Sequence, residues 1–127
     1  MHTPQLRQSA LTECGLTALA IIFAWHGVDV SLERLRNEIG SSRLGLTARQ
    51  LLELARRYDF ETKACRREID QLATLPLPFI AHYRFIHFVV VEHVSDQHVT
   101  INDPASGPQR LTIEEFARDF TGIALTF

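Results

Sequence analysis

Hydrophobic positions in the first half of the chain recur with a helical period. Residues 16–25 are almost wholly apolar, and a helix without a polar face is buried on all sides. Residues 31–40 and 47–58 carry apolar side chains at three- and four-residue spacing, which is the pattern of amphipathic helices. The first half therefore predicts a buried helix followed by two amphipathic ones.

Polar residues and glycines mark the expected ends of these helices. Thr12 precedes the first apolar run and is expected to cap it, and Gly27 is expected to end it in a left-handed turn. Ser31 is the expected cap of the second helix. Thr47 and Gln50 have the spacing of a capping box, which predicts the start of the third helix.

The second half of the chain changes from helical to extended patterns. One helical turn is expected near residues 68–76, before Pro76 and Pro78 break it. A capping box, Thr112 with Glu115, opens a last helix. Alternating or β-rich runs predict strands at 60–64, 79–83, 87–94, 98–103, 109–112 and 123–127. Helices first and hairpin-linked strands later predict an α+β fold, with N-terminal helices packed on a C-terminal antiparallel sheet.

Length, charge and cysteine content limit the classes of protein to be considered. The 127 residues suit one domain, residues 1–127, and a net charge of −2 argues against nucleic acid as a partner. Two cysteines form no disulfide framework, which favours a reducing compartment. No apolar run has the length of a membrane span and the start lacks a signal peptide, so we expect a soluble, cytoplasmic domain. Its apolar last residues predict a piece of a longer protein.

Cys14 stands where the chain changes from polar to apolar. In the first turn of the buried helix, free backbone N–H groups and the helix dipole favour a thiolate. Gly15 follows it, and a glycine there is expected to let another chain approach the backbone closely. This position predicts a cysteine nucleophile.

A nucleophilic cysteine needs a base and a group that orients the base. His26, His82, His93 and His98 are candidates, but His87 opens the most apolar strand and would be held in a fixed position. Asp103 ends the next strand, which is expected to pair with the strand of His87, and so can orient its imidazole.

Each of these residues also has an ordinary structural interpretation. A cysteine at a helix start is more often a small packing residue, His87 alone suggests a core histidine, and Asp103 before proline suggests a turn. A metal site is a weaker alternative, because its candidates show no tight ligand spacing: His82, His87, His93 and Cys65. A domain with a purely structural role also stays open on this evidence.

Four motifs in order along the chain resemble the C39 peptidase family, the cysteine peptidase domain of bacteriocin- and peptide-exporting ABC transporters. "QSALTECGLTALAII" resembles its cysteine motif, with Gln8 six residues before Cys14. "SLERLRNEIGSSRLGLTARQLLELARRY" is similar to its helical middle. "LPLPFIAHYRFIHFVVVEHV" resembles its histidine motif, and "INDPASGPQRLTIEEFARDFTGIAL" its aspartate–proline motif and closing segment. The resemblance implies a papain-like fold and runs nearly end to end.

The resemblance also implies roles for individual residues. Cys14 corresponds to the nucleophile, His87 to the general base and Asp103 to its orienter. Gln8 corresponds to the oxyanion-hole glutamine, together with the backbone N–H of Cys14. The acidic residue before the cysteine is often aspartate in this family and is Glu13 here, which leaves the chemistry unchanged.

The activity that the resemblance implies is removal of a leader by cleavage after a Gly-Gly type pair in a precursor peptide. It implies no metal and no cofactor for this domain, with ATP bound elsewhere in a full-length transporter. Expected partners are the precursor peptide and the transporter's transmembrane and nucleotide-binding domains, on the cytoplasmic side of the cell membrane. A docking module that binds leaders without cleaving them is the alternative, and Cys14 argues against it.

Overall fold

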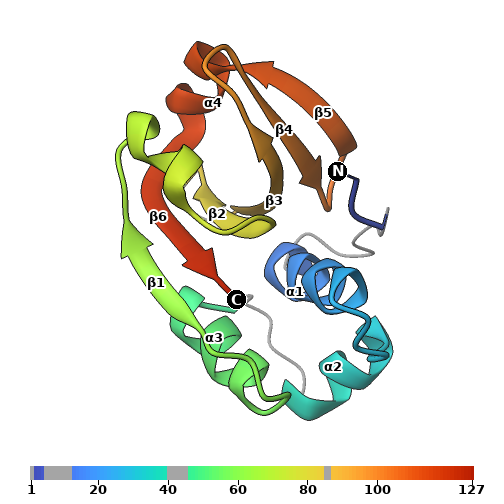
Figure 1. The fold of residues 1–127 in the computed structure, drawn as a ribbon. Coiled ribbons are helices and arrows are strands. Elements are labelled where there is room, and N and C mark those ends of the chain that lie inside the picture. Colours follow the sequence, from blue (N-terminus) through green and yellow to red (C-terminus); the bar gives the residue numbers. More distant parts are fainter. Residues whose placement is uncertain (1, 5–12, 40–45, 85–86) are drawn as a thin grey trace.

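The computed structural model describes residues 2–4, 13–39, 46–84 and 87–127. Three helices come first and strands follow, as the sequence predicts (Figure 1). In chain order the elements are α1 (Cys14–Trp25), α2 (Leu32–Ile39), α3 (Ala48–Arg56), β1 (Lys63–Arg66), the 3₁₀ helix η2 (Ile69–Thr74), β2 (Phe79–Tyr83), β3 (His87–Val94), β4 (His98–Asp103), β5 (Gly107–Thr112), α4 (Ile113–Asp119) and β6 (Phe120–Thr126).

The strands form one antiparallel sheet in the order β1-β6-β2-β3-β4-β5. The chain from β2 to β5 follows hairpin connections, and β6 then returns to lie between β1 and β2. The sheet curves strongly (Figure 1). The helices α1, α2 and α3 pack on one face of it, and η2 and α4 pack on the other. The α+β expectation is confirmed.

Alternation along the central strands supplies a core on each face of the sheet. Phe88 and Val90 of β3 join the cluster formed with α1, α2 and α3. Val89 and Val91 join the second cluster, which includes Phe116 of α4. Successive side chains of a strand point to opposite faces, so one apolar run serves both cores.

Local signals in the sequence fix several helix ends. The Thr47 hydroxyl oxygen accepts a hydrogen bond from the Gln50 N–H at 3.2 Å, and Gln50 Oε1 accepts one from the Thr47 N–H at 2.9 Å. Thr112 and Glu115 form the equivalent box at α4. Gly27 ends α1 with a φ of 75°, in the left-handed region that glycine enters without strain. Ser31 caps α2 through the Arg34 N–H at 3.1 Å.

Two expectations about the elements were wrong in detail. The strand expected at 60–64 is β1, at Lys63–Arg66, because the Phe60 ring stacks on Phe23 of α1 at 5.0 Å instead of joining the sheet. Burial of the first helix on all sides holds for Cys14–Phe23, whereas Trp25 is 39 % exposed where the helix leaves the core.

Candidate active site

Cys14 is the first residue of α1 and is only 5 % exposed. The N-cap position is occupied by Glu13, and Thr12, the expected cap, lies outside the described residues. The Glu13 carboxylate instead receives the guanidinium of Arg36, from Nη2 at 2.8 Å and from Nε. This ion pair connects the start of α1 to α2. The first N–H groups of a helix point out of its N-terminal end, which is the end that carries Cys14.

Gly15 lets α1 pack closely behind the thiol. A Cβ built on Gly15 would lie 3.1 Å from Leu51 Cδ1 of α3 and 3.1 Å from Phe88 Cδ2 of β3. The expectation that Gly15 lets another chain approach the backbone was therefore wrong, because these two side chains of the protein itself fill that space. The glycine permits close packing, and the packing fixes the position of Cys14.

His87 and Asp103 meet across neighbouring strands. β3 and β4 pair as expected, and His87 Nε2 lies 2.7 Å from Asp103 Oδ1. The same carboxylate oxygen accepts the Ala105 N–H at 2.8 Å, so the turn after β4 holds it in place. The side chain of His87 also hydrogen-bonds with that of Cys14. Because Nε2 is used by Asp103, Nδ1 is the ring nitrogen left for the thiol.

The charges in this cluster favour an imidazolium. Burial lowers the pKa of His87, but the hydrogen bonds to Asp103 and Cys14 and their charges outweigh it and raise the pKa to about 9. Burial also raises the pKa of Asp103, and hydrogen bonds from His87 and the Ala105 N–H outweigh this and hold it below its ordinary value. Cys14, His87 and Asp103 thus place a sulfur atom, a cationic imidazole and a carboxylate in series, an arrangement suited to nucleophilic attack.

The other candidates from the sequence lie elsewhere. His26 packs on Phe60, His98 lies beside Arg110 and His93 is exposed. His82 Nδ1 lies 2.9 Å from Thr121 Oγ1. Gln8, the expected oxyanion donor, falls outside the described residues.

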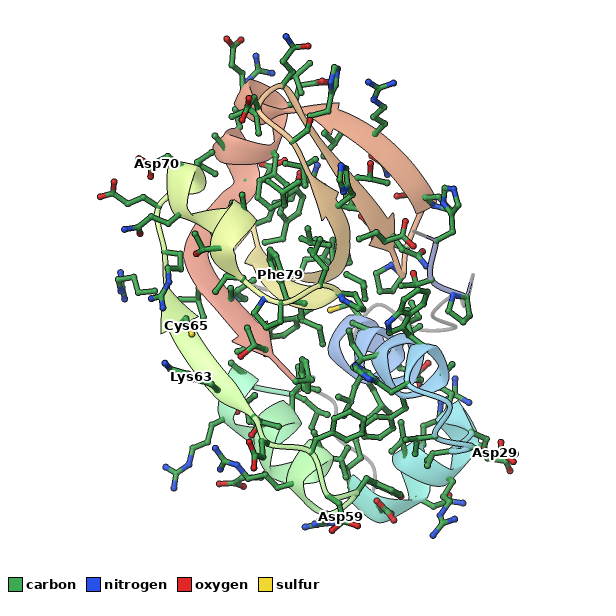
Figure 2. The ribbon with its side chains drawn as sticks, in the orientation of Figure 1. Asp29, Asp59, Lys63, Cys65, Asp70 and Phe79 are labelled. Atoms are coloured by element: carbon green, nitrogen blue, oxygen red, sulfur yellow. The ribbon has the colours of Figure 1, made fainter. Side chains whose placement is uncertain are left out.

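A metal site is not assembled from the proposed ligands. In the described ranges, no three His, Cys, Asp or Glu side chains come together in a way that could hold a metal ion. Cys65 lies on β1, across the molecule from α1 (Figure 2). The metal site that the sequence left open, from His82, His87, His93 and Cys65, is therefore not formed by these four residues.

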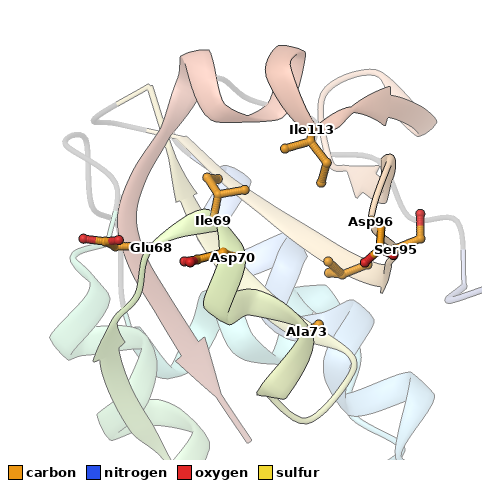
Figure 3. A pocket seen from close by; sticks show the side chains of 8 residues that line it. Glu68, Ile69, Asp70, Ala73, Ser95, Asp96 and Ile113 are labelled. Atoms are coloured by element: carbon orange, nitrogen blue, oxygen red, sulfur yellow. The ribbon is translucent and has the colours of Figure 1, made fainter.

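A pocket of about 440 Å³ lies at the other end of β3 from His87. It opens between η2 and the β3–β4 turn (Figure 3). Its lining residues are Glu68, Ile69, Asp70, Ala73, Val94, Ser95, Asp96 and Ile113. None of the three clustered residues is among them, so this pocket is separate from the candidate active site.

Similarity to known proteins extends over nearly the whole chain. The model of the "Peptidase C39 family" matches residues 2–127. The colicin V secretion/processing ATP-binding protein CvaB of Escherichia coli is 36 % identical over 98 % of this chain. The lactococcin-G-processing and transport ATP-binding protein LagD of Lactococcus lactis is 33 % identical over 89 % of it. The chain spans only 18 % and 17 % of the length of these two relatives. In the described residues no helix is long and apolar enough to cross a membrane.

Solved structures agree with the family match. A double glycine motif protease from an AMS/PCAT transporter, solved in complex with the leader peptide, has a TM-score of 0.94 and 39 % identity, covering 99 % of this chain and 91 % of that one. The peptidase domain of Streptococcus ComA has a TM-score of 0.88 and 27 % identity, covering 98 % and 96 %. These comparisons confirm the expected papain-like fold, and the chain belongs to the peptidase C39 family of cysteine peptidases.

Proposed function

We propose that this chain removes the leader from a precursor peptide by hydrolysis after a double-glycine motif. The single observation that carries the proposal is the hydrogen-bonded series of Cys14, His87 and Asp103 at the start of α1. The similarity to a double glycine motif protease solved with its leader peptide supports the substrate class. A glycine pair suits a slot too narrow for side chains, because glycine has no Cβ.

The proposed roles follow from the geometry. Cys14 is the nucleophile, and its thiolate attacks the carbonyl carbon of the second glycine. His87 holds the proton taken from the thiol as an imidazolium, and gives it to the leaving amine as the C–N bond breaks. Asp103 holds the imidazole by Nε2 so that Nδ1 faces the thiol. Water then hydrolyses the thioester, which releases the leader and restores the thiol.

The negative charge that develops on the carbonyl oxygen needs donors. We assign these to the Gln8 side chain and the backbone N–H of Cys14, the first residue of α1, because the first N–H groups of a helix point out of its N-terminal end. Donors of this kind contribute about 3 kcal/mol each to transition-state stabilisation where they have been removed. The proposed steps use only protein groups and water, so we assign no metal or cofactor to this domain.

The wider setting is part of the same proposal. Residues 1–127 would be the N-terminal peptidase domain of a longer ABC transporter, which binds ATP in its nucleotide-binding domains and exports the mature peptide through its transmembrane domains. The relatives CvaB and LagD support this setting, because their names join processing to secretion and to transport, respectively. The domain would face the cytoplasm, where precursor peptides are made.

Mass spectrometry of a synthetic precursor peptide with a Gly-Gly leader tests the function. We expect a single cut after the second glycine by the wild-type protein and none by Cys14→Ala. A matched peptide with valine in place of the second glycine should stay intact. If the wild-type protein binds the peptide but never cuts it, the docking alternative is correct.

A further inference from the structure

The first residues of the chain are held against strands of the sheet that are distant from them in sequence. Residues 2–4, here called the N-terminal strap, lie beside the end of the sheet where β4 turns into β5 (Figure 1). Thr3 is buried, and its partners are Glu92 of β3 and Asn102 of β4. Neither partner belongs to the triad, which is the cluster of Cys14, His87 and Asp103.

The hydrogen bonds around Thr3 have a defined direction. Asn102 Nδ2 donates to Thr3 Oγ1 at 2.8 Å and to the Pro4 carbonyl oxygen at 2.9 Å. An amide nitrogen only donates, so the Thr3 hydroxyl accepts there and donates its own hydrogen to Glu92 Oε2 at 2.6 Å. The Thr3 backbone N–H donates to the same carboxylate oxygen.

Glu92 occupies a position that the sheet builds specially. β3 pairs Val91 with Ile101 and His93 with Thr100, so Glu92 is the extra residue of a β-bulge. Bulges redirect a side chain out of the regular ladder. Glu92 is 1 % exposed and Asn102 is fully buried. Within the described part of the chain, Glu92 Oε1 and Asn102 Oδ1 have no hydrogen-bond partner, which costs folding free energy.

Two fixed points therefore lie on either side of residues 5–12 in the sequence. Asn102 holds Pro4 and is the chain neighbour of Asp103, which holds His87. At the other side, α1 and its ion pair fix Glu13 and Cys14. Gln8 lies between these points, four residues after Pro4 and six before Cys14. A four-residue connection reaches at most about 14 Å, so holding Pro4 limits where Gln8 can be.

We propose that Thr3, Glu92 and Asn102 form a clamp that positions the segment entering α1, and with it the oxyanion donor Gln8. They are positioning residues, because none of them belongs to the reacting groups. The inference rests on the proposed peptidase function. Its physical basis is that oxyanion donors stabilise a transition state only when they are held in place beforehand, and a small misplacement costs rate rather than substrate affinity.

Thr3→Val tests the clamp with little change in shape. The valine loses the hydroxyl that joins Asn102 to Glu92, whereas Thr3→Ser keeps it and is the matched control. We expect Thr3→Val to lower kcat roughly 10-fold with KM unchanged, and Thr3→Ser to stay within about 2-fold of wild type. Alkylation of Cys14 by iodoacetamide needs no oxyanion donor, so its rate should be the same in all three proteins.

Hydrogen–deuterium exchange gives a readout independent of activity. Peptides covering residues 1–12 should exchange faster in Thr3→Val than in wild type, while those of α1 should not change. A Thr3→Val protein with wild-type kcat, or with equal losses of kcat and alkylation rate, would overturn the proposal. If even the wild-type protein cuts no Gly-Gly peptide, the proposed function has failed, and the exchange comparison still decides whether the clamp exists. Glu92→Gln, which keeps an acceptor for Thr3, is a second variant with less risk to folding.

Discussion

His87 Nε2 and Asp103 Oδ1 are 2.7 Å apart, on strands that are neighbours in the sheet. This contact decides the orientation of the imidazole, because it leaves Nδ1 for the thiol of Cys14. The Ala105 N–H holds the same carboxylate oxygen, so the orienting group is itself oriented. A side chain in this position stabilises the imidazolium and keeps the ring in the reactive tautomer.

Asp103→Ala should therefore lower kcat far more than Asn102→Ala. Loss of the orienting carboxylate can cost up to about 10⁴ in kcat. The Asn102 side chain contacts Thr3 and Pro4, so its removal affects the triad only through the strap. Steady-state kinetics on a Gly-Gly leader peptide compares the two variants. The reverse order would make Asn102 the orienter and the triad Cys-His-Asn.

The pH dependence of kcat/KM should have an alkaline limb near pH 9. His87 is the proposed proton donor to the leaving amine, and its raised pKa of about 9 keeps it protonated through neutral pH. Activity should fall as the pH rises through that value. In Asp103→Asn the limb should move to lower pH, because the carboxylate charge that favours the imidazolium is gone. An unmoved limb would show that Asp103 does not act on His87.

Stability should follow the same titration. The pKa of His87 is raised in the folded protein relative to 6.5, so its contribution to stability is complete below about pH 6.5 and is lost as the pH rises through about 9. The difference in melting temperature between wild type and His87→Gln isolates this contribution. We expect the melting temperature of the wild type to fall relative to that of His87→Gln as the pH rises from 6.5 to 9.5. A constant difference over that range would contradict the raised pKa.

Gln8→Ala should lower kcat by roughly 10²–10³ and leave KM nearly unchanged, since an oxyanion donor acts in the transition state. Gln8→Glu should be at least as damaging, because a carboxylate would repel the oxyanion. Steady-state kinetics measures both, with circular dichroism to confirm folding. A Gln8→Ala enzyme within a few-fold of wild type in kcat would leave the backbone N–H groups as the whole oxyanion hole.

Signals that act over a few residues were predictable from the sequence. The capping boxes at Thr47 and Thr112 formed because the side chain and the N–H that it binds are only three residues apart. The β-rich run of residues 87–94 predicted strand β3, and the pairing of β3 with β4 followed from the short turn between them. The meeting of Cys14 with His87 was one interpretation among several until the family resemblance selected it, because the packing of a helix on a sheet does not follow from local spacing.

Contacts between distant parts of the chain were not predictable in this way. β6 lies between β1 and β2, although it is the last strand of the chain, because its apolar residues complete both cores. Thr3 and Glu92 are 89 residues apart, and nothing in the pattern around either residue indicates the other. Glu13 at the start of α1 pairs with Arg36 of the next helix, 23 residues further along the chain, and no local spacing indicates this pair.

The central claim is that Cys14 carries the leader as a thioester during cleavage. Acid quenching of a single turnover, followed by peptide mapping with mass spectrometry, measures this directly. The claim predicts a mass increase equal to the leader acyl group on the peptide that contains Cys14, with Cys65→Ser behaving like wild type because Cys65 lies on the far strand β1. An acyl group on Cys65, or full turnover by Cys14→Ala, would contradict it.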